Sequence, residues 1–383
     1  MEFRFPSGYG STLLIVLLFI LGSIYTYYPM SWKGTDEVNL EGEGYLKNTS
    51  ELDNVLDHRF SPETRFLSAV TNGGLGNQMC SYAITYAMAK LTKRQGIIFP
   101  WTYKDLSRYF RITLPVILNE TTWKCSGSAG TDWMSEEHYL LHSPCVVLSG
   151  YYQSWTFFHH AREDVIREFT FHDSYRLQAW RTLSELRGNR TRPTYVGVHV
   201  RRGDYIGRIW DAFRGTLADK GYIRRAMDYF RGRYTEVVFV VASDGMSWCK
   251  ENINNSLGDV YFVGHGDPYK PGHDLALLAH CNHTIMTFGT FGFWAGYLAG
   301  GEVTYLANFT LPDSSWASSR PDQKQCLPDW IPIQANISYL YKKASSEATP
   351  QTTANATVTP VDETEKKGRL WERLKEMMRP VFR

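Results

Sequence analysis

The sequence predicts an α/β fold built around parallel β-sheets, and three observations support that prediction. Beyond residue 190, short apolar runs alternate with helical patterns, which is the order typical of a parallel sheet with helices on both faces. Nearer the N-terminus, a glycine-rich turn at residues 72–78 separates an apolar run from a helical pattern. The length of 383 residues and the apolar fraction of 43% allow one large domain or two ordinary ones.

The first globular part opens with a strand-turn-helix-strand pattern. Residues 66–71 are expected to form a buried strand, residues 79–93 a helix and residues 96–99 a returning strand. The glycine-rich turn between strand and helix is similar to a dinucleotide-binding fingerprint, but Met79 stands where the third glycine belongs. We therefore expect no nicotinamide or flavin site, although the glycines permit close approach of the backbone to a ligand. The residues predicted to be buried on the helix are Met79, Tyr82, Ala83, Tyr86, Ala87 and Leu91.

The second part begins after a polar linker at residues 188–193, where we expect a domain boundary. Ligands of parallel sheets bind beyond the carboxyl ends of the strands, so side chains just past those ends are candidate site residues. The expected strands cover residues 194–198, 236–242, 260–263, 284–287 and 302–306, and the expected helices cover residues 247–253, 274–280 and 292–299.

The run His-Val-Arg-Arg-Gly-Asp at the first of these strands carries the sharpest signal. Arg201 and Arg202 stand side by side at the end of an apolar strand, where an unpaired charge is costly. A diphosphate would suit them, because guanidinium groups donate in a planar, bidentate manner to phosphate oxygens. The alternative is a structural ion pair in which Asp204 neutralises one arginine. Ser243 and Thr290 also follow predicted strands, so one crevice could hold them together with the arginines.

Residues 1–64 have the composition of a membrane anchor followed by a linker. Residues 11–28 carry no charge and are long enough to cross a bilayer as a helix. Arg4 precedes them and tyrosines follow, which is typical of a membrane interface. We expect a cytosolic tail at residues 1–10, an uncleaved signal anchor and a polar luminal stem at residues 29–64. A cleaved signal peptide is the alternative, although a clean small-residue cleavage site is missing.

Sequons and cysteines fit a luminal, oxidising compartment. Asn282 is expected to stay unmodified, because it precedes what should be a buried strand. Six cysteines lack the paired spacing of zinc sites, so one to three disulfides are expected, with the pairing left open. A further sequon stands at Asn355. The asparagines expected to carry glycans are Asn48, Asn119, Asn189, Asn254, Asn308 and Asn336.

Five segments together carry a family resemblance. Residues 132–137, 154–160, 197–205, 281–295 and 305–314 resemble motifs of the galactoside α-1,2-fucosyltransferases. The resemblance covers roughly the region between the stem and the C-terminal tail. It implies an inverting enzyme that transfers L-fucose from GDP-β-L-fucose to the 2-hydroxyl of a terminal β-galactose, forming an α-1,2 linkage in glycoprotein or glycolipid glycans.

The resemblance also implies an architecture and a location. Two Rossmann-like halves would form a GT-B-like fold with a central donor/acceptor cleft, preceded by the transmembrane helix. Residues 65–190 would form the acceptor-side domain and residues 191–340 the GDP-fucose-binding domain. Residues 341–383 are expected to be a disordered tail on composition. Such enzymes are single-pass type II proteins of the Golgi membrane with a luminal catalytic domain.

Individual roles follow from the resemblance as well. Arg201 and Arg202 would hold the diphosphate, and Asp204 would orient an arginine. Asp274 would accept hydrogen bonds from guanine, and Asn77 would reach across the cleft toward fucose or acceptor. The remaining donor-binding candidates are His199, Ser243, Asp244, Gly289, Thr290, Phe291 and Gly292, and the remaining acceptor-side candidates are Asp132, Trp133, Glu136 and Trp155.

The reaction needs stabilisation of the leaving diphosphate and a base for the acceptor hydroxyl. No Asp-x-Asp motif for a divalent metal occurs in the chain, so we expect the two arginines to stabilise the diphosphate without a metal or another cofactor. The base stays unassigned, and the departing phosphate could itself take the proton. The candidates for the base are Asp132, Glu136, Glu137, His159 and His160.

Several positions depart from the family pattern. Gly74 stands where Arg is expected, Cys80 and Ser81 replace Gly-Glu, Gln153 replaces Cys and Asp244 replaces Asn. These changes motivate an alternative, a pseudoenzyme or carbohydrate-binding protein that keeps the donor cleft without turnover. Further departures are His273, His280, Phe213 and Arg214.

Other function classes receive less support. The failed dinucleotide pattern and the lack of a Gly-Lys-Ser/Thr phosphate loop disfavour an oxidoreductase or phosphotransferase. A net charge of +2 gives no electrostatic reason to expect nucleic-acid binding. The expected partners are GDP-fucose, β-galactoside glycans and the membrane, and the sequence leaves a homo-oligomer open.

Overall fold

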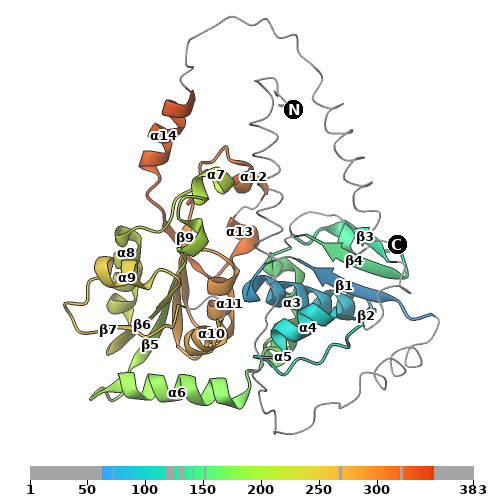
Figure 1. The fold of residues 1–383 in the computed structure, drawn as a ribbon, viewed down its shortest axis with the longest axis horizontal. Helices are drawn as coiled ribbons and strands as arrows, with labels where there is room; N and C mark the ends of the chain where they lie inside the picture. Colours follow the sequence, from blue (N-terminus) through green and yellow to red (C-terminus); the bar gives the residue numbers. More distant parts are fainter. Residues whose placement is uncertain are drawn as a thin grey trace, which may run out of the picture. The chain divides into compact units, whose positions relative to one another are not determined.

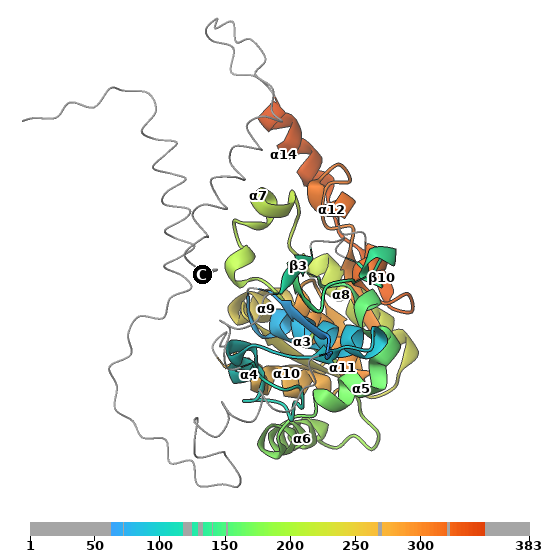
Figure 2. The ribbon, with the colours of Figure 1, turned by 90° about the vertical axis from the view of Figure 1, so that its right-hand side faces the viewer.

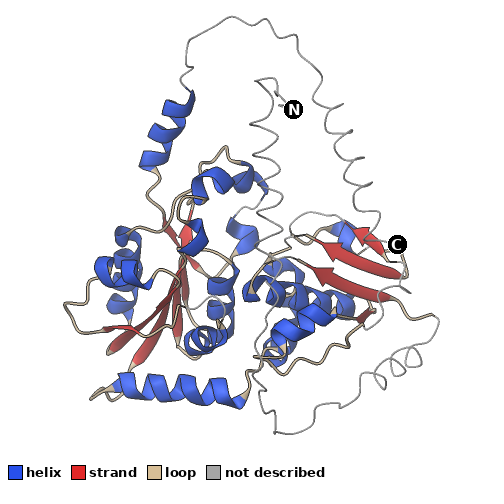
Figure 3. Cartoon of the chain, viewed as in Figure 1, coloured by secondary structure: helices blue, strands red, loops and turns tan. Residues whose placement is uncertain are grey.

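Two parallel β-sheets organise the chain (Figures 1 and 3). The structure is a computed structural model that describes residues 63–71, 73–117, 125–128, 133–139, 141–150, 152–266, 270–319 and 322–348. The smaller sheet has the strand order β2-β1-β4-β3, and the larger has the order β10-β9-β8-β5-β6-β7. The predicted α/β fold with parallel strands is confirmed, whereas the domain boundaries expected at residues 65–190 and 191–340 stay a prediction.

The smaller sheet is centred on β1. β1 (Phe66–Val70) pairs with β2 (Gln95–Gly96) on one side and β4 (Cys145–Ser149) on the other, and β3 (Ser126–Ser128) pairs with β4. The α-helices of this part are α3 (Leu75–Leu91), α4 (Pro100–Leu106), α5 (Arg162–Glu168) and α6 (Asp173–Arg187), and short 3₁₀ turns cover Glu136–His138, Trp155–Phe157 and His159–Ala161.

Helix α3 corrects the predicted turn and the predicted buried face. It begins at Leu75, four residues before the predicted start, so the turn ends at Gly74 and Asn77 lies on the helix. Tyr86 is only half-buried and Leu91 is exposed, while the other four residues of the predicted face are buried. With 17 residues α3 is about 25 Å long, whereas the five-residue β1 spans about 17 Å, so the last turns of the helix extend beyond the strand.

The larger sheet has six strands. β5 (Thr194–Val200) lies at its centre between β6 (Val237–Ser243) and β8 (His283–Met286). The outer strands are β7 (Val260–Phe262), β9 (Val303–Ala307) and β10 (Ile331–Gln334). The helices are α7 (Ile209–Phe213), α8 (Lys220–Arg233), α9 (Met246–Asn252), α10 (Gly272–Ala279), α11 (Thr290–Ala299), α12 (Ser315–Ser319), α13 (Asp322–Gln325) and α14 (Ser338–Ala348), with a 3₁₀ turn at Gly203–Tyr205.

The predicted strands and helices of this part are found within two residues of their expected ends, and β5 extends to include His199. The expectation of a disordered tail from residue 341 is wrong for residues 341–348, which belong to α14. The cause is Leu340, which is fully buried beside Trp210 and Leu311 and anchors the helix. Residues 349–383 lie outside the described part of the chain.

One hydrophobic core connects the two sheets. Helix α11 packs against α3 (Figure 2), and the fully buried Trp294 of α11 stacks on Phe158 with ring centroids 5.2 Å apart. The Trp294 indole N–H donates to the Gly76 carbonyl at 3.0 Å. The start of α3 and the start of α11 are thereby fixed to each other, although 214 residues separate Gly76 from Thr290.

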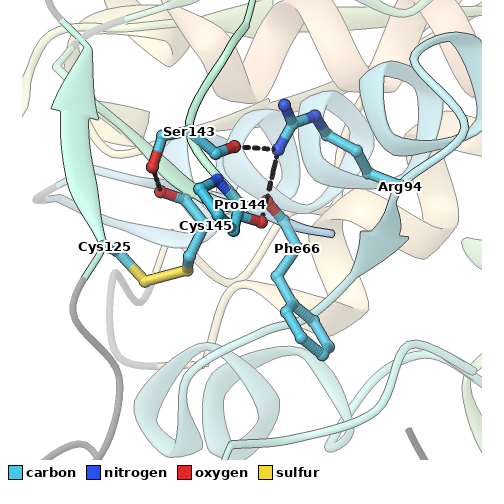
Figure 4. The surroundings of a disulfide bond; sticks show 6 residues. All are labelled: Phe66, Arg94, Cys125, Ser143, Pro144 and Cys145. Carbon is cyan, nitrogen blue, oxygen red and sulfur yellow. Dashed lines mark hydrogen bonds between the residues drawn. A yellow bond between two sulfur atoms is a disulfide. The ribbon is translucent and has the colours of Figure 1, made fainter. Parts of the chain in front are cut away.

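A disulfide joins Cys125 and Cys145, at the beginnings of strands β3 and β4 (Figure 4). Arg94 supports the same corner by donating to the carbonyls of Ser143 at 2.8 Å and Phe66 at 3.2 Å. The expectation of at least one disulfide is thus met. The thiols of Cys80, Cys249 and Cys281 are buried and reduced.

The predicted sequons differ in what the structure says of them. Asn189, Asn254, Asn308 and Asn336 are exposed, whereas Asn48, Asn119 and Asn355 lie outside the described residues. Asn282 is also exposed, so its expected burial is wrong: the residue precedes β8, and the burial begins at Thr284. Its side-chain oxygen accepts from the Tyr195 N–H at 2.9 Å.

The predicted anchor at residues 11–28 lies outside the described residues, as does the predicted stem up to residue 62. Within the part that the structure describes, we find no helix with both the length and the apolar character needed to cross a membrane.

A substitution at Gly76 tests how closely helices α3 and α11 pack. A Cβ at this position would lie 2.7 Å from the backbone of Thr290 and Phe291. We expect Gly76→Ala to lower the free energy of unfolding by about 1–3 kcal/mol, as overpacking does, despite the better helix propensity of alanine. The measurement is urea unfolding followed by circular dichroism. Gly74→Ala is the matched control, since a Cβ there meets nothing within 4 Å; equal losses in both variants would contradict the prediction.

Candidate active site at the carboxyl edge of the larger sheet

The candidate site lies where three neighbouring parallel strands end. In the strand register Val200 of β5 is opposite Ser243 of β6, and His199 is opposite Met286 of β8. The next residue on each strand is therefore Arg201, Asp244 or Thr287. The strands are largely buried, and the residues that follow their ends are polar, with Arg201 and Asp244 at the same level and Thr287 one residue earlier along β5.

Arg201 is held between two carboxylates. Its guanidinium forms ion pairs with Asp244 and with Asp204, and its backbone N–H donates to the Thr287 hydroxyl at 3.0 Å. The guanidinium carbon lies 5.3 Å from the centroid of the Tyr205 ring. The side chain keeps 31% of its surface exposed, so it is fixed in direction without being sealed from a ligand.

Arg202 has a different environment. Its guanidinium carbon lies 4.1 Å from the ring centroid of Trp248, and its backbone N–H donates to Asp244 at 2.7 Å. Its Nε is buried without a hydrogen-bond partner among the described residues, and burial lowers the pKa of the guanidinium. An unpaired buried donor on a cation is unfavourable, so an acceptor oxygen from a ligand would stabilise it.

Helix α11 supplies a second source of positive potential. It begins directly after β8, and Gly289 before it has a φ of 91°, a left-handed conformation that favours glycine. The first turn of a helix presents backbone N–H groups whose dipoles attract anions. Since α11 follows β8, its first turn lies at the same sheet edge as Arg201.

Asn77 reaches this helix from the smaller sheet. Its side-chain oxygen accepts from the Thr290 hydroxyl at 2.8 Å and from Gln153 Nε2 at 3.0 Å. The structure thus brings together Asn77, Thr290 and Gln153, the residue that replaces the cysteine of the family pattern. Its predicted contact with fucose or acceptor stays a prediction.

His199 forms the buried floor of the site. Its ring packs on Phe291 with centroids 4.8 Å apart, and a Cβ on Gly292 would lie only 2.9 Å from its Nδ1. Burial, together with the nearby charge of Arg201, lowers the pKa of His199 to about 3. The imidazole is therefore neutral at physiological pH, and Gly292 is required for its close approach to α11.

Ser243 and Asp274 shape the loops around the site. The Ser243 hydroxyl donates to the Val200 carbonyl at 2.6 Å and accepts from the Gly245 N–H at 2.9 Å. Asp274 is buried and accepts from the N–H groups of His265 at 2.8 Å and Gly266 at 3.0 Å. Each carboxylate oxygen keeps a further lone pair, so the predicted contact with guanine is compatible with the geometry and stays a prediction.

Among the described residues, the remaining acceptor-side candidates Trp133, Glu136 and Trp155 lie in the segments before and after β4. Glu136 is exposed in the 3₁₀ turn Glu136–His138, and the Trp155 ring packs edge-on against His159 with centroids 5.8 Å apart. Trp133 is half-buried. Asp132 lies outside the described residues, and the placement of the Glu137 side chain is not described.

The two histidines proposed as bases have structural contacts. His159 Nδ1 is 3.3 Å from the Tyr297 hydroxyl, and burial lowers its pKa. His160 Nε2 is 3.2 Å from the Ala87 carbonyl. The structure does not bring either ring to the edge where Arg201 lies, and the base stays unassigned.

Two residues of the site were assigned no role from sequence. Thr287 follows β8 just as Arg201 follows β5, and this equivalent position could have identified it. Trp248 lies four residues after Asp244, one helical turn into α9, and only the three-dimensional packing reveals its stacking on Arg202. Among the described residues, no cluster of three or more His, Cys, Asp or Glu side chains could hold a metal ion.

An α/β fold with an arginine pair and a helix N-terminus at one sheet edge is typical of proteins that bind phosphorylated ligands. Residues 53–334 match the glycosyl transferase family 11, a range that includes both sheets and every described donor-binding and acceptor-side candidate. The chain therefore belongs to glycosyl transferase family 11.

Named relatives agree with this assignment. The chain is 51% identical over 280 residues to galactoside alpha-(1,2)-fucosyltransferase 1 of Homo sapiens, covering 71% of this chain and 76% of the relative. It is 49% identical over 275 residues to galactoside alpha-(1,2)-fucosyltransferase 2 of Bos taurus, covering 70% and 79%. A mutant of Arabidopsis thaliana FUT1 in complex with GDP overlays on 69% of this chain and 76% of its own, with 14% identity and a TM-score of 0.44. The family assignment rests on the sequence matches.

The buried His199 predicts a pH dependence of stability. Because its pKa falls from 6.5 to about 3 on folding, the unfolded state binds more protons between these values, and stability decreases as the pH drops through that window. From pH 7.5 to pH 5 we expect this residue to account for a loss of about 2 kcal/mol, measured by urea unfolding at both pH values. In His199→Gln that part of the loss should disappear.

The control is His142→Gln, which removes an exposed imidazole. If wild type and His199→Gln lost the same stability between the two pH values, the neutral, buried state of His199 would be refuted.

Proposed function

We propose that this protein transfers L-fucose from GDP-β-L-fucose to the 2-hydroxyl of a terminal β-galactose, with inversion and without a metal ion. The observation that carries the proposal is the 51% identity over 280 residues to an α-(1,2)-fucosyltransferase, within a matched range that includes the arginine pair. The arrangement of charges at the sheet edge supports it, because the leaving GDP develops negative charge on its diphosphate.

The arginines are suited to that charge in complementary ways. Asp204 and Asp244 fix the direction of Arg201 before any ligand binds, so little ordering entropy remains to be lost. A guanidinium has five N–H donors, and these two carboxylates use only some of them. In the proposal Arg202 gains a phosphate acceptor for its buried donor, and the first turn of α11 adds its N–H groups.

Asp204 serves as a positioning residue in this scheme. Its carboxylate binds Arg201 and lies 3.6 Å from Arg208, so it is already engaged with two cations. Both oxygens of the Asp204 carboxylate thus lie against guanidinium groups. The proton of the acceptor hydroxyl therefore goes to another group or to the departing phosphate.

The second candidate function is donor binding without turnover. The departures from the family pattern at Gly74, Cys80 and Gln153 motivate it, and Gln153 donates to Asn77, the residue expected to contact fucose or the acceptor. A binding protein of this kind would show a raised melting temperature with GDP and release no GDP from GDP-fucose.

The proposal includes a location in the Golgi lumen, behind a signal anchor at residues 11–28. The charge-free run in the sequence, the disulfide Cys125–Cys145 and the exposed sequons such as Asn254 support it.

Incubation of the full chain with GDP-fucose and a panel of β-galactosides, including lactose, tests the proposed reaction. We expect GDP release and a product whose linkage analysis shows α-1,2-fucose, at equal rates with and without EDTA. GDP binding without release would support the binding protein instead. A rate lost in EDTA and restored by Mn²⁺ would refute metal independence.

Arg201→Ala tests whether Arg201 stabilises the leaving diphosphate. Removing one preorganised stabiliser of a developing anion should lower kcat/KM for GDP-fucose by about 10²–10³-fold. Arg201→Lys should recover part of this, because it restores charge without bidentate geometry. The control is Arg224→Ala, an exposed arginine of α8, and circular dichroism checks that the variants fold. Near-normal kcat/KM in folded Arg201→Ala would show that the arginine is a structural ion-pair residue.

A further inference from the structure

The segment that follows the arginine pair connects directly to the candidate site. Residues 203–216, which we call the site loop, contain the 3₁₀ turn Gly203–Tyr205 and helix α7. Asp204 pairs with Arg201, and the Tyr205 ring lies beneath its guanidinium. The conformation of the site loop therefore decides where Arg201 points.

Helix α14 lies near α7 in the ribbon (Figures 1 and 2), and it contacts this loop through the Trp210 indole. Trp210 Nε1–H donates to Glu347 Oε1 at 2.8 Å. The Trp210 ring centroid is 4.5 Å from Lys343 Nζ and 4.7 Å from the guanidinium carbon of Arg214. Glu347 Oε2 is 3.8 Å from Arg214, so one carboxylate binds both the indole and a neighbouring cation.

The contact also has an apolar part and a second hydrogen bond. Leu340 is fully buried against Trp210 and Leu311 in a small cluster of its own. Removing this apolar side chain from water stabilises the contact between the helix and the loop. Tyr339 O–H donates to the Thr216 hydroxyl at 2.7 Å, at the end of the site loop.

A chain of aromatic contacts leads from α7 back to the arginine. Phe213 packs on Trp316 with ring centroids 4.2 Å apart and on Tyr205 at 5.7 Å. Tyr205 is also held edge-on by Phe288 at 4.7 Å. Arg214 has a left-handed φ of 50°, which costs free energy for a non-glycine residue and persists only where neighbours enforce it. Its contacts with Glu347 and Trp210 do so here.

We propose that α14 is a strap that fixes the site loop, and that Glu347 is a positioning residue for Arg201. This rests on the proposed function, since it assigns the strap an effect on GDP-fucose. Glu347 lies beyond residue 334, where the family match ends, so the strap is outside the matched range. Without the strap the site loop moves, Asp204 and Tyr205 no longer fix Arg201, and the donor binds more weakly.

Glu347→Ala in the full chain is the first test. We expect the KM for GDP-fucose to rise about three- to tenfold, as for loss of a half-exposed hydrogen bond to a charged group, while the acceptor KM stays within about twofold. Lys342→Ala is the matched control, because Lys342 is an exposed residue of the same helix that takes no part in the contacts with Trp210. Its kinetics should equal those of wild type.

A double-variant cycle identifies the contact itself. Trp210→Phe keeps an aromatic ring for Lys343 and Arg214 but removes the indole N–H that binds Glu347. We expect Glu347→Ala and Trp210→Phe together to raise the donor KM no more than the larger single change, because both remove one hydrogen bond. Fully multiplied effects would show that Glu347 does not act through Trp210.

Hydrogen exchange without ligand separates this inference from the proposed function. Amide exchange of residues 203–216 should be faster in Glu347→Ala than in wild type and in Lys342→Ala. If wild type turns over no GDP-fucose, the proposed function fails, and the exchange result still decides on the strap. If exchange and donor KM are both unchanged in Glu347→Ala, or if only the melting temperature falls, the strap is refuted.

Discussion

The structure depends above all on the ion pairs that hold Arg201 between Asp204 and Asp244. The pair with Asp244 occurs because β5 and β6 are parallel and end at the same level, whereas Asp204 follows Arg201 by three residues in the turn Gly203–Tyr205. The same register places the Thr287 hydroxyl at the Arg201 backbone and the start of α11 beside it. The sheet topology thus places Arg201 at this edge, and the adjoining loop orients its side chain.

The junction of α3 and α11 is the second constraint. Trp294 fills the core between the sheets and binds the Gly76 carbonyl, while Asn77 binds Thr290 one turn away from it. The same two helices are therefore joined both by the apolar packing of Trp294 and by the hydrogen bond between Asn77 and Thr290. This arrangement keeps the first turn of α11 at a fixed distance from the smaller sheet, on which the acceptor-side candidates lie.

Sequence patterns predicted what depends on local periodicity and on strand ends. Five of the six strands of the larger sheet, and the positions of Arg201, Ser243 and Thr290 just past strand ends, followed from apolar runs ending in polar residues. The start of α3 was missed because two closely spaced glycines, Gly74 and Gly76, are typical of a turn. Gly76 instead lies within the helix, and its missing side chain leaves room for the close approach of α11. Residues 341–348 were expected to be disordered because their composition is polar, yet the buried Leu340 and the contacts of Tyr339, Lys343 and Glu347 anchor the helix. The stacking of Trp248 on Arg202 depends on tertiary packing and has no sequence signature.

The two adjacent arginines have unequal environments, and this difference bears on the proposed reaction. Arg201 is compensated by carboxylates before a ligand arrives, so binding a diphosphate changes its surroundings modestly. Arg202 lies on an indole with a buried, unpartnered Nε, so it gains the most from an anionic acceptor. If carboxylates neutralised both guanidiniums, the site would attract the donor less strongly. If they neutralised neither, two like charges would lie side by side at a half-buried sheet edge. One fixed and one unsatisfied guanidinium reconcile a stable ligand-free site with strong binding of a diphosphate.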